Sequence, residues 1–107
     1  MKTYVGVFTA RLETPWVNSL KEKRALIRPV MERIKARFPV SAARVAGLDE
    51  HGWEQVAFSV IGGDAEWVIG VLDAVERFLN GAGEYRVVVL VREVVVFDGT
   101  MSPELER

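Results

Sequence analysis

Basic side chains are concentrated in residues 19–37, and their spacing suits the binding of phosphate groups. This segment has seven basic and two acidic residues, whereas the rest of the chain has seven basic and thirteen acidic residues. A ridge of cations on one flank of a helix can bind a phosphate backbone without reading its sequence. On a helix, four of these side chains fall within an arc of roughly 60°, namely Lys21, Arg24, Arg28 and Lys35.

The same candidate site extends to the start of the expected helix. Ser19 and Glu22 have the spacing of a capping box, and the free N–H groups of the first turn attract anions. Trp16, just upstream, has a ring that could stack on a base. We therefore predict an RNA- or anion-binding set made of Ser19, Lys21, Lys23, Arg24, Arg28 and Lys35.

A structural interpretation of the same residues stays open. Charged helix flanks are commonly solvated faces, and Arg stems also cover apolar surface. Lys and Arg are good helix formers in their own right. Trp16 would in that case pack over the edge of the sheet or in an oligomer interface.

Residues for catalysis or metal binding do not form a recognisable set. His51 is the only histidine and the chain has no cysteine, so we expect no metal site. Ser19 has a capping role and no partnered base, and Gly62-Gly63-Asp64 is better explained as a turn followed by a helix cap than as a phosphate loop. We expect neither a cofactor nor enzymatic activity. A weaker alternative is a small enzyme that acts on a phosphorylated substrate and uses Arg11 or Arg24 as an anion clamp.

Composition indicates one domain. The 107 residues are 50% hydrophobic, carry a formal net charge of -1 and include three Asn and Gln residues in all, at positions 18, 55 and 80. No apolar stretch is long enough to span a membrane, and the lack of cysteine fits a cytoplasmic protein. The scarcity of Asn and Gln favours a thermophilic source.

Hydrophobic periodicity predicts six elements in the order βαββαβ. Strands are expected over 3–13, 40–46, 53–61 and 85–97, with helices over 19–38 and 64–80. Asn80-Gly81 resembles a C-terminal cap. The predicted fold is ferredoxin-like α+β, with a four-stranded antiparallel sheet of order 4-1-3-2 and both helices on one face. Residues 1–97 form the domain and 98–107 a tail.

The uncovered sheet face is expected to be apolar. Strict alternation places Val5, Val7, Thr9 and Arg11 of the first strand on it. On the last strand, alternation places Val88, Leu90, Arg92 and Val94 there. Half-exposed valines are also ordinary in strands, and this interpretation stays open. Because such a face is unusually apolar for one left in water, we favour a homo-oligomeric regulatory or scaffold module. Its interface, or a small-ligand cleft between subunits, would be formed by Val5, Val7, Val88, Leu90 and Arg92.

The stretch Asn-Ser-Leu-Lys-Glu-Lys-Arg at 18–24, opening a helix after a strand with Gly-Val, resembles the YlxP-like family of small bacterial proteins. The similarity covers about residues 3–97 and includes the Arg37-Phe38 helix end and the Arg92-Glu93 pair. It implies a ferredoxin-like fold and an association with RNA or the ribosome. It supplies no catalytic residue. The Thr-Pro-Trp-Val segment before the motif departs from the smaller residues expected there.

Overall fold

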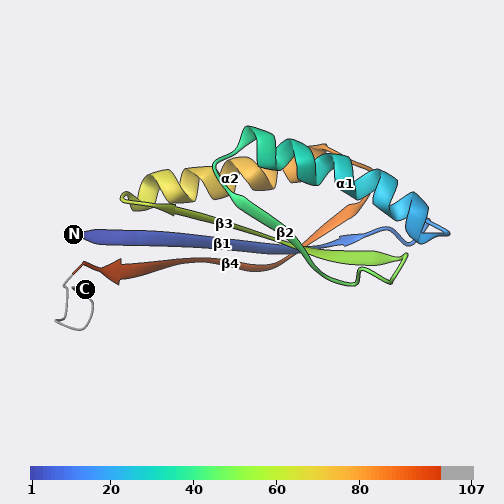
Figure 1. Ribbon diagram of the computed structural model, residues 1–107, viewed down its shortest axis with the longest axis horizontal. Coiled ribbons are helices and arrows are strands. Elements are labelled where there is room, and N and C mark those ends of the chain that lie inside the picture. The colour runs from blue at the N-terminus through green and yellow to red at the C-terminus, as the bar shows by residue number, and fades with distance from the viewer. Residues whose placement is uncertain (100–107) are drawn as a thin grey trace, which may run out of the picture.

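The computed structural model describes residues 1–99, which form four strands and two helices (Figure 1). All six predicted elements are present, with slightly different ends. Their bounds are β1 (Lys2–Glu13), α1 (Leu20–Arg37), β2 (Ser41–Ala46), β3 (Trp53–Gly62), α2 (Ala65–Gly81) and β4 (Arg86–Asp98). The predicted tail begins inside β4, because that strand continues through Asp98, and residues 100–107 lie outside the described residues.

The strands form one antiparallel sheet of order β2-β3-β1-β4. Both helices lie on the same side of it (Figure 1). This is the predicted ferredoxin-like α+β fold. The N-terminal end of β1 and the C-terminal end of β4 extend past the start of α2 (Figure 1). The pairing of β1 with β3 starts at Tyr4, which lies opposite Gly62.

Helix α1 begins where its sequence provides a cap. The Ser19 hydroxyl oxygen accepts a hydrogen bond from the backbone N–H of Glu22 at 3.1 Å, which satisfies one free donor of the first turn. Pro29 lies inside the helix, as expected, and is exposed. The buried stripe of α1 contains Ile27, Met31 and Ile34.

Helix α2 begins at the predicted cap but ends differently. Asp64 accepts a hydrogen bond from the N–H of Trp67 at 3.3 Å. Gly81 is still helical, and Ala82 follows as the C-cap in a right-handed conformation, so the predicted cap at Asn80-Gly81 is wrong. Tyr85 compensates in part, because its hydroxyl donates to the carbonyl oxygen of Leu79 at 2.6 Å.

Helix α2 packs closely on the sheet because β1 has a glycine beneath it. A Cβ added to Gly6 would lie 2.8 Å from Val68 and 2.9 Å from Leu72. Val68 and Leu72 are completely buried in the core between α2 and the sheet. Gly6 therefore sets the distance between α2 and β1.

An irregularity in β4 changes which of its residues face the open side of the sheet. Thr9 pairs with Val91 and Ala10 with Val89, so Leu90 is an additional residue without a partner. An inserted residue reverses the alternation beyond it. Arg92 therefore lies on the helix side, where it bonds Asp73 and Glu76 of α2.

The prediction of the open face is thus correct only in part. Val5 and Val7 of β1 and Val88 of β4 lie on it, since Arg11 pairs with Val88. The placement of Arg92 and Val94 on that face is wrong, and Val91, Glu93 and Val95 take their place. Simple alternation fails here because it assumes an uninterrupted strand.

Candidate functional site

Lys23, one of the predicted phosphate ligands, is buried beneath α1. Its side chain is 0% exposed, and its Nζ lies 3.0 Å from Oε1 of Glu54, which is also 0% exposed. Nζ donates in addition to three backbone carbonyls, at 2.7, 2.5 and 3.2 Å. Two of them belong to Gly47 and Glu50 of the β2–β3 connection, and the third belongs to Trp53, the first residue of β3. The predicted contact between Lys23 and a phosphate is therefore wrong, because this ammonium holds the hairpin connection against α1.

Glu54 is shared between two cations. Arg44 of β2 donates to it through Nε at 2.5 Å and through a terminal nitrogen at 2.8 Å. Burial raises the pKa of the Glu54 carboxyl, but the hydrogen bonds and positive charges of Arg44 and Lys23 outweigh burial, so the net pKa is lowered. The carboxylate thus stays ionised in the folded chain and compensates Lys23.

A signal for this cluster is present in the sequence. Lys23 lies four residues before Ile27 and eleven before Ile34, which is the period of the buried stripe. Glu54 precedes Val56, Phe58 and Val60 in the alternation that faces the helices. Opposite charges at two core-facing positions indicate a buried ion pair, whereas a count of charges along the segment does not separate Lys23 from its exposed neighbours.

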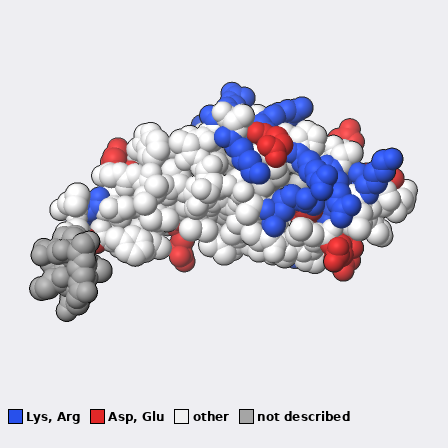
Figure 2. Space-filling view, viewed as in Figure 1, with Lys and Arg blue, Asp and Glu red and all other residues white. Residues whose placement is uncertain are grey.

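The other cations of the first half of α1 line a groove on the surface. The groove has a volume of about 440 Å³ and is lined by Lys21, Arg24, Ala25, Arg28 and Pro29. Figure 2 shows Lys and Arg side chains gathered over this part of α1. Within residues 1–99, no carboxylate forms an ion pair with Lys21, Arg24 or Arg28. We call Lys21, Arg24 and Arg28 the α1 cation ridge.

Arg24 differs from its two neighbours on the ridge. It is half-buried, and its Nε is inaccessible and has no hydrogen-bond partner. Buried N–H groups without a partner are rare in folded proteins. Lys21 and Arg28, in contrast, are exposed. The ridge therefore combines two solvated cations with a third that is held against the protein.

A second groove continues the positive surface toward β2. It has a volume of about 310 Å³, and Arg28 belongs to both grooves. Lys35 and Arg44 line it as well, but Lys35 lies 3.6 Å from Glu32, and Arg44 is engaged with Glu54. Lys35 therefore lies where it was predicted, beside the ridge, with part of its charge compensated.

The loop before α1 is fixed by contacts with the β2–β3 connection. The Thr14 hydroxyl donates to the carbonyl oxygen of His51 at 2.9 Å, and Nδ1 of His51 lies 2.9 Å from the carbonyl oxygen of Val17. His51 thus has a structural contact. Trp16 projects from this loop and is 51% exposed, and it is not among the residues that line the α1 groove.

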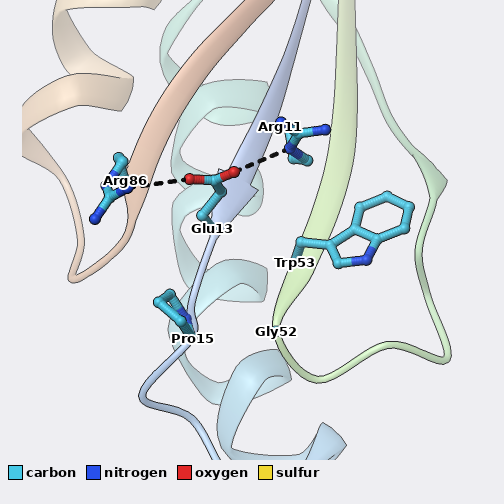
Figure 3. Close-up of a pocket in the computed structure, with 6 residues that line it drawn as sticks. All are labelled: Arg11, Glu13, Pro15, Gly52, Trp53 and Arg86. Carbon is cyan, nitrogen blue, oxygen red and sulfur yellow. Dashed lines mark hydrogen bonds and ion pairs between the residues drawn. The ribbon is translucent and has the colours of Figure 1, made fainter.

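Another hollow lies at the end of β1, on the open side of the sheet. It measures about 360 Å³ (Figure 3). Glu13 lies between Arg11 and Arg86, at 3.2 and 3.6 Å from their nitrogens. Because a carboxylate occupies the position between the two guanidinium groups, Arg11 is not arranged as an anion clamp. The described residues also contain no group of three His, Cys, Asp or Glu side chains arranged to hold a metal ion.

The fold and these surfaces define a small ferredoxin-like α+β protein with a basic first helix. The chain belongs to a family described as a protein of unknown function (DUF503), whose model matches residues 5–92. A comparison with curated proteins finds no match. Neither helix in the described part of the chain has the length and apolar composition needed to cross a membrane.

Proposed function

We propose that this protein is a non-catalytic, RNA-binding or ribosome-associated protein that contacts the phosphate backbone through the α1 cation ridge. The supporting observation is that Lys21, Arg24 and Arg28 line one groove and have no ion pair within residues 1–99. Cations without internal partners can bind the phosphates of a polyanion directly and release the counterions that were condensed on it. The proposal includes two further points: that the chain is one of the YlxP-like proteins, as residues 18–24 suggest, and that it is located in the cytoplasm.

The ridge also has a suitable length. From Lys21 to Lys35 the axis of α1 rises by about 21 Å, and adjoining grooves accompany it over this distance. Consecutive phosphates of one strand follow each other at a few ångströms, so several can lie along such a surface. Apart from Glu32, the charged residues that line the two grooves are basic.

The test is a binding titration with a fluorescently labelled structured RNA at about 0.1 M salt. The variant Lys21→Gln/Arg24→Gln/Arg28→Gln should bind on the order of 100-fold more weakly, because each lost phosphate contact removes about 5-fold in affinity at this salt concentration. A matched control, Lys2→Gln/Arg33→Gln/Arg77→Gln, removes three exposed cations elsewhere and should keep most of the affinity. Equal losses in both variants, or no binding by the unchanged chain, would overturn the proposal.

A homo-oligomeric scaffold or regulatory module is the second candidate function. The observation that favours it is the exposure of seven large apolar side chains on a single strand, β4. Light scattering on the purified chain distinguishes this candidate, because a strict monomer at high concentration has no such interface.

A further inference from the structure

The two edges of the sheet differ in how they are protected. β2 forms one edge with six residues, and a register shift after Arg44 interrupts it. β4 forms the other edge with thirteen residues. Sheet proteins protect long edges with lysine, proline, short strands or bulges. β4 contains neither lysine nor proline, and its irregularity at Leu90 leaves residues 91–98 in regular pairing with β1. The charged residues of this segment are Arg92, which is bonded to Asp73 and Glu76 of α2, together with Glu93 and Asp98.

The outer part of β4 is exposed on both of its faces. On the helix side lie Val94 and Val96, and on the open side lie Val91 and Val95. Their exposed fractions, with those of other β4 residues, are 44% for Val89, 42% for Leu90, 42% for Val91, 36% for Val94, 41% for Val95, 52% for Val96 and 55% for Phe97. A strand whose residues 94–97 are all apolar, and which is exposed on two faces and along its backbone edge, has the properties of a strand that pairs with another strand.

Helix α2 adds to this surface. Ile69 is exposed and precedes Asp73 by four residues, so both side chains lie on the same flank of the helix. Asp73 contacts Arg92 of β4, which places this flank toward the β4 edge. The half of the molecule near the N-terminus is also largely free of charged side chains in the view of Figure 2.

We propose that a second copy of this chain pairs its β4 with this β4 in antiparallel orientation, around a twofold axis at Val95, to form one continuous eight-stranded sheet. A second copy is the partner that always provides a matching strand, because a twofold interface presents the same surface from both sides. Both helical layers then lie on the same face of the joined sheet.

Charge complementarity selects this register. Around a twofold axis, opposed residues must share a face, so the axis passes through one residue and its own copy. An axis at Arg92 or Glu93 would oppose like charges, which is unfavourable. With an axis at Val95, Arg92 lies opposite Asp98 of the other copy, and this pair occurs twice in each dimer. Val94 then lies opposite Val96 of the other copy. Arg92 is already bonded to Asp73 and Glu76, and Asp98 faces Lys2 within its own chain, so each such pair joins an existing group of charges. The same axis places Glu93 opposite Phe97 of the other copy.

The first test measures molar mass by light scattering. The unchanged chain should be a dimer, and Val95→Lys should be a monomer, because two ammonium groups would meet at the axis. The matched control Val45→Lys changes a 49% exposed valine on the opposite edge strand and should stay dimeric. A monomeric unchanged chain, or equal behaviour of the two lysine variants, would overturn the proposal.

Charge reversal keeps the test decisive if a variant folds poorly. Val95→Glu alone should be monomeric, whereas an equimolar mixture of Val95→Glu and Val95→Lys should form a heterodimer, because opposite charges then meet at the axis. Failure of the mixture to associate, with both variants folded by circular dichroism, would contradict the register.

Disulfide formation tests the position of the axis independently. The chain has no cysteine, so a single introduced cysteine reports one contact. Opposed residues of antiparallel strands have Cα atoms about 4.5–5.5 Å apart, within the range of a disulfide. Val95→Cys should form a covalent dimer on mild oxidation, whereas Val94→Cys and Val96→Cys should cross-link mainly with each other. Faster self-cross-linking at position 94 or 96, or at a control Val45→Cys, would contradict an axis at Val95.

Discussion

Nζ of Lys23 lies 3.0 Å from Oε1 of Glu54, and both side chains are fully withdrawn from solvent. This contact joins the first turns of α1 to β3, and the three carbonyls bound by the same ammonium join α1 to the β2–β3 connection and to the first residue of β3. The Ser-Leu-Lys-Glu-Lys-Arg stretch therefore has two physical roles. Ser19 and Lys23 fix the helix in place, and Lys21 and Arg24 face the groove.

The first prediction concerns Lys23→Met. This substitution removes the donor of three carbonyls and leaves Glu54 with Arg44 as its one cation. Removal of one partner from a buried ion pair typically costs about 3–5 kcal/mol, and we expect a loss of that size in the free energy of unfolding, measured by urea denaturation. The control Lys21→Met, at an exposed position, should change it by less than about 0.5 kcal/mol. Similar losses in both variants would contradict the structural role of Lys23.

The second prediction concerns the pH dependence of stability. The pKa of Glu54 is lowered from its ordinary value of 4.5 in the folded chain. A lowered folded-state pKa contributes stability that is fully present above the unfolded-state pKa and is lost as pH falls through the folded-state value. The free energy of unfolding should therefore decrease as the pH is lowered below about 4.5.

Glu54→Gln should remove this part of the pH dependence, and it should also lower stability at neutral pH because Lys23 and Arg44 lose their shared carboxylate. Glu84→Gln, at an exposed position without an ion pair in residues 1–99, is the matched control. The free energy of unfolding, measured by denaturation over a range of acidic pH values, should depend on pH in the control as it does in the unsubstituted chain. An identical pH dependence in Glu54→Gln would show that this carboxylate is not the source.

The third prediction compares two glycines. Gly6→Ala places a methyl group 2.8–2.9 Å from Val68 and Leu72, and overpacking of this kind costs about 1–3 kcal/mol. Gly70→Ala lies on the exposed side of α2 with no atom within 4 Å of the added Cβ, and it should stabilise the chain by about 0.5–1 kcal/mol. Thermal unfolding should shift in opposite directions for the two variants. A shift in the same direction would contradict the close contact at Gly6.

The fold was predictable because local signals and periodicity agree. The capping residues Ser19 and Asp64 mark both helix starts, and Val56, Phe58 and Val60 mark the buried side of β3. The additional residue Leu90 was not predictable, since a bulge inside the uniformly apolar run 87–91 leaves no compositional mark. The error at Arg92 follows from that single insertion.

The candidate site was predictable in outline. Lys21, Arg24 and Arg28 lie on one flank, as their helical spacing indicates. Lys23 was assigned to the wrong environment because a lysine is rarely buried, and its partner Glu54 is thirty-one residues away in the sequence. Periodicity places each of the two charges on a core-facing position, but the sequence does not give the register of β3 or the position of α1 that brings the two side chains into contact.

The most direct test of the proposed function is the salt dependence of RNA binding. The association constant of the unchanged chain for a structured RNA should fall linearly with salt concentration on logarithmic axes. The slope should decrease by about one unit for each of Lys21→Gln, Arg24→Gln and Arg28→Gln, whereas Lys23→Gln should leave the slope of the folded protein unchanged because its ammonium is buried. A slope that none of the three ridge substitutions alters would contradict the assignment of the α1 cation ridge as the phosphate-binding surface.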